Sequence, residues 1–156
     1  MLDAIASDGV VAIRPLGEGD AAILIEGRDT ESERWLGPAS SDPTPRACII
    51  VDGDIVGWVD YDIDREWLEP GEVNIGYNVF AEHRRRGYAS RAVELFIGYL
   101  GRETDFRSAT LLINDENIGS LAVAAKLGCE AHGDIEGSRY FKLPISRQRI
   151  GHWRQG

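Results

Sequence analysis

The sequence predicts a single α/β (α+β) domain spanning residues 1–156 and built on a mostly antiparallel sheet. Its first half has the pattern of a β meander without crossover helices, and its second half alternates strand, helix, strand, helix and strand. An Asp52-Gly53 pair, typical of a hairpin turn, separates two β-rich runs. These patterns exclude a doubly wound parallel sheet, in which helices would connect the strands throughout.

Glycine and proline divide the first half into short elements. Pro15 ends the first β-rich run, and Gly19-Asp20 precedes an apolar stretch that predicts a helix. Three prolines after the second helix predict a loop. Strands are predicted at 10–14, 47–51 and 55–61, and short helices at 21–25 and 31–36.

The second half contains the clearest strand, residues 72–80, because apolar and polar side chains alternate strictly along it. After a polar turn at 81–86, apolar residues recur at helical spacing until Gly101, which predicts the end of that helix. The last elements are strands at 108–113, 129–135 and 138–143, a helix at 118–127, and a loosely held tail at 147–156.

The composition is that of a soluble globular protein, with 43% hydrophobic and 28% charged residues. No apolar run approaches the ~20 residues that cross a bilayer, and no secretory signal is evident, so we expect a cytoplasmic protein. The net charge of −9 argues against nucleic acid and membrane surfaces and favours a cationic partner. The two cysteines and three histidines lack ligand spacing, which predicts no disulfide and no metal site.

The segment HRRRGYASR, residues 83–91, is the strongest candidate for a binding site. A helix N-terminus offers free N–H groups, Gly87 and Ala89 admit a phosphate, and arginines add charge. The six residues 84–89 alone also describe an ordinary glycine turn. Their position between a strand and a helix favours a pyrophosphate site, although neither a Walker loop nor a dinucleotide fingerprint is present.

The wider segment IGYNVFAEHRRRGYASRAVELF resembles the [Q/R]-x-x-G-x-[G/A] motif, with its flanks, of the GNAT superfamily of acyl-CoA-dependent N-acetyltransferases. Downstream, NIGSLAVAAKLGC resembles a family helix that an Asn opens and Lys-Leu-Gly-Phe closes, with Cys129 where Phe is usual. IRPLGEGDAAIL is similar to the opening of the branch that acetylates ribosomal-protein N-termini. The resemblance covers residues 13–143.

This resemblance implies an N-acetyltransferase that transfers the acetyl group of acetyl-CoA to a primary amine by direct attack in a ternary complex. It implies a GNAT-like sheet of six to seven strands with about four helices, splayed between the fourth and fifth strands to admit pantetheine. A backbone N–H near Val79 would polarise the thioester carbonyl. The expected cofactor-binding residues are Asn78, Val79, Phe80, Ala81, Arg84, Arg85, Arg86, Gly87, Tyr88, Ala89, Ser90 and Asn117.

The attacking amine must lose a proton, so a general base is expected. Glu72 is the first candidate because it shares a strand face with Asn74, although a carboxylate at a strand start is more often solvated. The alternatives are Asn74 acting through a water, Asp60 and Asp62.

The position of the general acid departs from the family pattern. Many members place a tyrosine seven residues after the helix-opening Asn, and here that residue is Ala124. Ser120, close to the CoA sulfur in the resembling branch, is the candidate, and its alternative role is helix packing. The thiolate can also leave without a protein acid.

Two function classes stay open: an N-acetyltransferase, and a non-catalytic acyl-CoA-binding regulatory module. The second stays open because Ala124 stands where many family members have a tyrosine. The match at 117–128 disfavours a phosphate site unrelated to CoA. The acceptor is expected to be a basic protein N-terminus, a polyamine or an aminoglycoside-like amine. Trp35, Trp67 and Tyr77 can line its pocket, core packing is the preferred role of Trp58, and a homodimer is compatible with the sequence.

Overall fold

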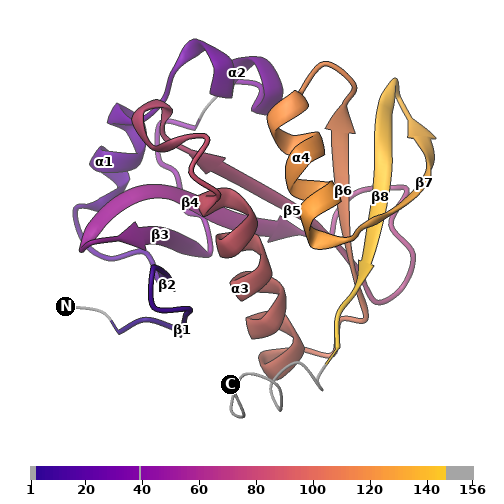
Figure 1. The fold of residues 1–156 in the computed structure, drawn as a ribbon, viewed down its shortest axis with the longest axis horizontal. Coiled ribbons are helices and arrows are strands. Elements are labelled where there is room, and N and C mark those ends of the chain that lie inside the picture. The colour runs from indigo at the N-terminus through magenta and orange to yellow at the C-terminus, as the bar shows by residue number, and fades with distance from the viewer. Residues whose placement is uncertain (1–2, 39, 147–156) are drawn as a thin grey trace.

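In the part of the chain that the structure describes, residues 3–38 and 40–146, eight strands form one sheet in the order β1-β2-β3-β4-β5-β6-β8-β7 (Figure 1). The structure is a computed structural model. The strands are β1 (Ala6–Ser7), β2 (Val11–Arg14), β3 (Ala47–Val51), β4 (Asp54–Asp62), β5 (Glu72–Val79), β6 (Ser108–Asn114), β7 (Glu130–Ile135) and β8 (Ser138–Pro144). The helices are α1 (Asp20–Glu26), α2 (Thr30–Leu36), α3 (Tyr88–Glu103) and α4 (Ile118–Leu127), with a 3-10 turn η1 (Ala81–His83).

The predicted fold class is confirmed, since all strand neighbours are antiparallel except β5 and β6. The predicted strands recur within one residue of their expected bounds. The expected count of six to seven strands was too low by the edge strand β1. Its two residues pair with Ile13 and Ala12, and a run this short leaves no alternating pattern in a sequence.

The predicted end of the long helix at Gly101 was wrong. α3 continues to Glu103, and Gly101 is buried inside it. A Cβ at this position would lie 2.9 Å from the carbonyl oxygen of Ser146, so the glycine permits the chain after β8 to approach the helix. The predicted loose tail at 147–156, with His152, lies outside the described residues.

Two hairpin turns fix the register of their strands. Asp52 and Gly53 have φ values of 52° and 82°, and Glu136 and Gly137 have φ values of 51° and 83°. Positive φ at both central residues is the backbone of a two-residue type I′ turn, whose twist matches that of paired strands. The Asp-Gly hairpin predicted between β3 and β4 is therefore confirmed.

The two faces of the sheet differ in what covers them. α3 and α4 pack on one face over the main apolar core, to which β5 contributes Val73, Ile75 and Val79. On the opposite face, Leu24 of α1 packs with Cys48 and Phe80 in a smaller cluster. Farther along this face the residues are polar, and we call Asp60, Glu72, Asn74, Thr110 and Lys142 the polar face because strand register places them on one side.

β5 and β6 separate soon after they meet. They pair in parallel only over residues 72–74 and 108–110, whereas β5 continues to Val79 and β6 to Asn114. The two strands start side by side and diverge toward their carboxyl ends (Figure 1). The predicted splay between the fourth and fifth strands, counted without β1, is confirmed.

Candidate active site

Past its short pairing with β6, one backbone edge of β5 pairs with no other strand among the described residues. The Phe80 N–H donates to the Val56 carbonyl at 2.8 Å, which sets the phase of the β4–β5 ladder. Because alternate residues of an antiparallel strand bond to the same neighbour, the N–H and C=O groups of Ile75, Tyr77 and Val79 point away from β4. An extended ligand can add to such an edge as an extra strand.

The expected cofactor-binding residues at the end of β5 differ in whether their backbone lies on this edge. Val79 lies on the edge, and its carbonyl accepts a hydrogen bond from Arg84 Nε at 2.7 Å. The Val79 N–H points away from β4 and can bond to a ligand. Asn78 and Phe80 turn their backbone groups toward β4, and Ala81 already belongs to η1. The Ile75 carbonyl and both backbone groups of Tyr77, absent from the predicted set, also lie on the edge, whereas the Ile75 N–H still belongs to the parallel ladder that ends with the pairing of Asn74 and Thr110.

The loop from Arg84 to Tyr88 has the backbone geometry of an anion cradle. Arg85 and Gly87 have φ values of 64° and 81°, so left-handed residues alternate with others immediately before α3. Successive N–H groups of such a nest converge, and the first turn of a helix adds free N–H groups and a positive dipole end. Ser90 supports the turn by donating its hydroxyl to the Gly87 carbonyl at 3.1 Å.

Lys126 adds a cation to this cradle from α4. A Cβ built on Gly87 would lie 3.5 Å from Lys126 Nζ, so the ammonium group stands directly over the glycine. The side chains of Arg85 and Arg86 are exposed beside it. The sequence identified Lys126 only as part of a helix pattern, because 39 positions separate it from Gly87 and nothing local reveals their contact.

Arg84 is engaged inside the protein. Its guanidinium donates to Asp29 at 2.6 and 3.0 Å, to Glu31 at 3.0 Å and to the Asn78 side chain at 3.2 Å. This hydrogen bonding holds the pKa of the Asp29 carboxyl well below its usual range. Arg84 therefore ties the cradle loop to α2, and the phosphate contact expected from its side chain stays a prediction.

Asn117 and Ser120 lie at the start of α4, as the sequence predicted for a helix-opening Asn. The Asn117 side-chain oxygen accepts from the Ser120 N–H at 3.2 Å and caps the helix. The Ser120 hydroxyl accepts a hydrogen bond from the Tyr77 hydroxyl at 2.8 Å. Tyr77 was expected in an acceptor pocket, and the structure instead directs its side chain toward α4.

Glu72 is buried in the polar face and fully engaged. Its Oε2 lies 2.7 Å from Lys142 Nζ, and its Oε1 accepts from the Glu69 N–H at 3.0 Å and the Tyr140 hydroxyl at 3.1 Å. Burial raises the pKa of Glu72, but the hydrogen bonds from Lys142, Glu69 and Tyr140 outweigh it, so the net pKa is lowered. These contacts favour a structural role for this carboxylate.

Asp60 is less constrained than Glu72. Its Oδ1 accepts from the backbone N–H groups of Arg46 and Tyr61 at 3.2 and 2.9 Å, and its side chain is 37% exposed. Burial raises the pKa of Asp60 above its ordinary value. It lies opposite Gly76 of β5, which has no side chain to fill the space beside it. Of the two remaining candidates, Asn74 meets Thr110 Oγ1 at 3.4 Å, and the partly exposed Asp62 pairs with Arg65 Nε at 3.2 Å.

Aromatic side chains flank the polar face at both ends. Trp58 packs in the smaller cluster, near Gly76, as its predicted core role requires. Trp67 meets the ring of Tyr140 edge-on with centroids 5.1 Å apart. Trp35 lies in α2, and its buried indole N–H has no hydrogen-bond partner within the described residues.

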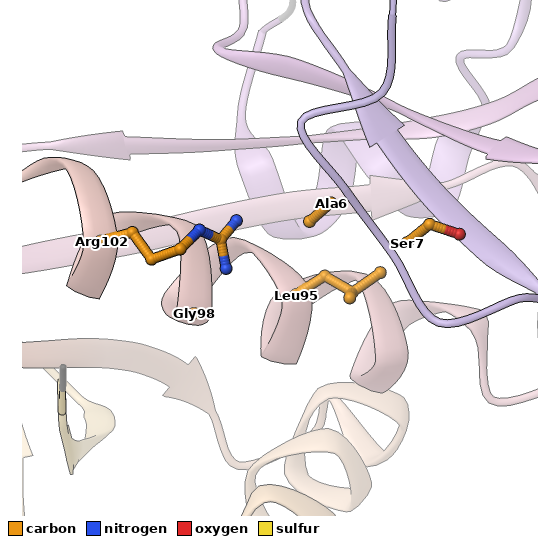
Figure 2. Close-up of a pocket in the computed structure, with 5 residues that line it drawn as sticks. All are labelled: Ala6, Ser7, Leu95, Gly98 and Arg102. Carbon is orange, nitrogen blue, oxygen red and sulfur yellow. The ribbon is translucent and has the colours of Figure 1, made fainter. Parts of the chain in front are cut away.

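Other features lie apart from this site. Figure 2 shows a hollow between β1 and α3, lined by residues including Ser7, Leu95 and Arg102. β1 is the edge strand at the end of the sheet away from β6, so this hollow lies far from the splay. Among the described residues, no cluster of three or more His, Cys, Asp or Glu side chains could hold a metal ion. No described helix combines the length and apolar character needed to cross a bilayer.

Comparison with solved structures identifies the fold. Mycobacterium smegmatis RimJ in complex with CoA-disulfide matches with a TM-score of 0.69 and 19% identity, over 87% of this chain and 82% of that one. Aminoglycoside acetyltransferase AAC(6')-Ib in complex with coenzyme A matches with a TM-score of 0.72 and 19% identity, over 92% and 99%. RimL, a ribosomal L7/L12 alpha-N-protein acetyltransferase, matches with a TM-score of 0.68 and 14% identity, over 92% and 99%.

At these identities the structural matches establish a shared fold, and the family assignment comes from the sequence. No curated protein matches the chain significantly in sequence. The family described as "Acetyltransferase (GNAT) domain" matches residues 11–130, which is most of the chain. The chain therefore belongs to the GNAT acetyltransferase family and is an acetyl-CoA-dependent acyltransferase.

Proposed function

We propose that this chain acetylates a primary amine on a cationic acceptor, by direct attack of the amine on acetyl-CoA in a ternary complex. One observation carries the proposal: the unpaired edge of β5 leads straight into the cradle at the start of α3. This continuity provides a strand edge for the pantetheine amides and an anion site for the pyrophosphate at its end.

The charges around the cradle fit a pyrophosphate. The N–H groups of residues 85–89 supply hydrogen bonds, and Arg85, Arg86 and Lys126 supply cations near Gly87. Asn117 keeps its amide N–H groups for the pantetheine arm, since its oxygen caps α4. The other predicted residues Tyr88, Ala89 and Ser90 form the first turn of α3, where they contribute backbone rather than side-chain contacts.

The polar face supplies the acceptor side. The Val79 N–H, free on the strand edge, is suited to polarise the thioester carbonyl as charge develops on its oxygen. Asp60 fits the general base best, because its pKa is raised, it is half-exposed and it lies opposite Gly76. The alternatives are a water held by Asn74, and Glu72 if it releases Lys142.

A cationic acceptor fits the surface charge. The chain carries a net charge of −9, and Asp62 and Glu69 add acidic groups beside Asp60 of the polar face. Such a field raises the local concentration of protonated amines. RimL and AAC(6')-Ib, whose fold this chain shares, are named for a protein N-terminus and an aminoglycoside as acceptors, so both classes belong in the test.

The test combines binding with turnover. Acetyl-CoA and CoA should raise the melting temperature, since a ligand at 100 times its dissociation constant adds about 2.7 kcal/mol, and ATP should not. Thiol release is then measured with basic N-terminal peptides, aminoglycosides and polyamines, each against an N-blocked or acidic counterpart. Stabilisation by CoA without acetylation of any amine would support the regulatory module, and no stabilisation would refute acyl-CoA binding.

A further inference from the structure

A hydrogen bond between Tyr77 and Ser120 bridges the two sides of the splay. Tyr77 lies on the stretch of β5 that no longer pairs with β6, and Ser120 lies in the first turn of the helix that follows β6. Their hydroxyl oxygens are 2.8 Å apart, with Tyr77 as donor. The contact therefore lies where the proposed acetyl-CoA would run between the strands.

We propose that Tyr77 is a positioning residue for the leaving thiolate: by donating to Ser120, it holds the Ser120 hydroxyl so that its proton is offered to the CoA sulfur. This inference rests on the proposed acetyl transfer and names what assists its leaving group. Ser120 is the residue that contacts the substrate, and Tyr77 acts through it.

The local hydrogen bonding supports this orientation. The Ser120 N–H is held by the Asn117 side chain at 3.2 Å, which fixes the backbone of the residue. Its hydroxyl oxygen is already an acceptor from Tyr77, and within the described residues its own proton has no acceptor. A hydroxyl fixed in this way directs its donor outward, toward an anion that arrives between the strands.

The chemistry assigns a hydrogen bond, and no proton transfer, to the pair. When the amine forms the C–N bond, the C–S bond breaks and its electron pair stays on sulfur, while the proton of the amine passes to the base or to water. A thiol has an ordinary pKa of about 8.5. Burial raises the pKa of Tyr77 to about 12, so the phenol keeps its proton and remains a donor. The thiolate takes its proton from solvent on release.

The test follows the thiol of bound CoA and needs no acceptor amine. Dissociation constants of CoA and desulfo-CoA are measured from below to above the thiol pKa for the wild type, Tyr77→Phe and Ser120→Ala. In the wild type, CoA should gain affinity over desulfo-CoA as the thiol ionises. Loss of one hydrogen bond to an anion should shrink this gain by about threefold to tenfold in both variants.

Two controls separate positioning from structure. Tyr99→Phe removes a hydroxyl from α3, where the ring stacks on Phe96, and should leave the thiol titration unchanged. The double variant Tyr77→Phe/Ser120→Ala should titrate like Ser120→Ala alone, because the tyrosine acts only through the serine. If Tyr77→Phe fails to fold, an unchanged titration in Ser120→Ala still overturns the inference, because Tyr77 acts only through the Ser120 hydroxyl and Ser120 is a partly exposed residue.

The outcomes are distinct. An unchanged pH dependence in Tyr77→Phe or Ser120→Ala, with CoA still bound, overturns the inference and leaves the proposed function standing. Failure of the wild type to bind either CoA or desulfo-CoA overturns the proposed function, and the inference with it. Once an acceptor is known, Tyr77→Phe should lower kcat by about threefold to tenfold without raising KM for acetyl-CoA.

Discussion

Arg84 and Asp29 form a bidentate ion pair, with Nη1–Oδ2 and Nη2–Oδ1 distances of 2.6 and 3.0 Å. Asp29 also caps α2 by accepting from the Ser32 N–H at 2.9 Å. One carboxylate thus joins the start of α2 to the loop that forms the cradle. Arg84, the first arginine of the motif, therefore holds the cradle loop in place. The side chains of Arg85 and Arg86 are exposed, so their positive charge is available to a ligand.

We expect Arg84→Ala to lower the free energy of unfolding by about 1–3 kcal/mol, because it leaves a partly buried carboxylate without its partner. Urea unfolding at neutral pH measures the loss. Arg34→Ala is the matched control, since its ion pair with Glu116 is exposed on both sides and should be worth less than about 1 kcal/mol. Equal losses in the two variants would contradict a structural role for Arg84.

The same ion pair predicts how stability depends on pH. The pKa of Asp29 is lowered in the folded protein, whereas the pKa of an aspartate in the unfolded chain is about 3.9. The contribution of the pair is therefore complete above the unfolded pKa and is lost as the pH falls toward the lower folded value. The difference in stability between wild type and Arg84→Ala should be constant above about pH 5 and narrow below about pH 4. A difference independent of pH would contradict the pairing.

Gly87→Glu should abolish binding of CoA while the protein stays folded. The substitution places a carboxylate beside Lys126 where the pyrophosphate would bind, at a φ of 81° that side chains rarely adopt. Calorimetric titration with CoA and a melting curve measure the two effects. Gly133→Glu makes the same change at positive φ on the edge strand β7, with no neighbour within 4 Å, and should bind CoA normally. Unchanged affinity in Gly87→Glu would refute the cradle.

Lys126→Ala should weaken CoA binding by about threefold to thirtyfold, because it removes a charge-assisted contact to a phosphate. The loss should shrink as salt is added, since screening already weakens an exposed ion pair. Arg139→Ala removes one positive charge from an exposed position on β8 that is paired with Asp115, and should leave affinity unchanged. An equal loss in both variants would assign the effect to net charge rather than to contact.

Most of the fold and the location of the cradle loop could be predicted from the sequence, because both depend on patterns of residues close together in the chain. The alternation of apolar and polar residues along 72–80 predicted strand β5, and the glycines of the turns predicted where neighbouring strands begin and end. Gly101 was misread because a helix stop and a close packing contact both favour glycine, and only the approach of Ser146 distinguishes them.

The contacts within the site could not be predicted in this way. The partner of Arg84 lies 55 positions away, and that of Tyr77 lies 43 positions away. The strand pattern did place Tyr77 with Val73 and Ile75 on the apolar face, which was the available sign that its ring faces the helices. Which hydroxyl it meets depends on the docking of α4.

Asp60→Asn and Glu72→Gln distinguish the two candidate bases. If Asp60 accepts the proton, Asp60→Asn should lower kcat/KM by about a hundredfold and remove the decline in rate on the acidic side, which follows protonation below its raised pKa. Glu72→Gln should instead cost about 2–4 kcal/mol of stability, because Lys142 loses a buried partner at 2.7 Å, and should keep the wild-type pH profile. Rate profiles with a known acceptor and urea unfolding measure both. A shifted profile in Glu72→Gln with an unaltered one in Asp60→Asn would return the base to Glu72, and two unaltered profiles would assign proton removal to a water at Asn74.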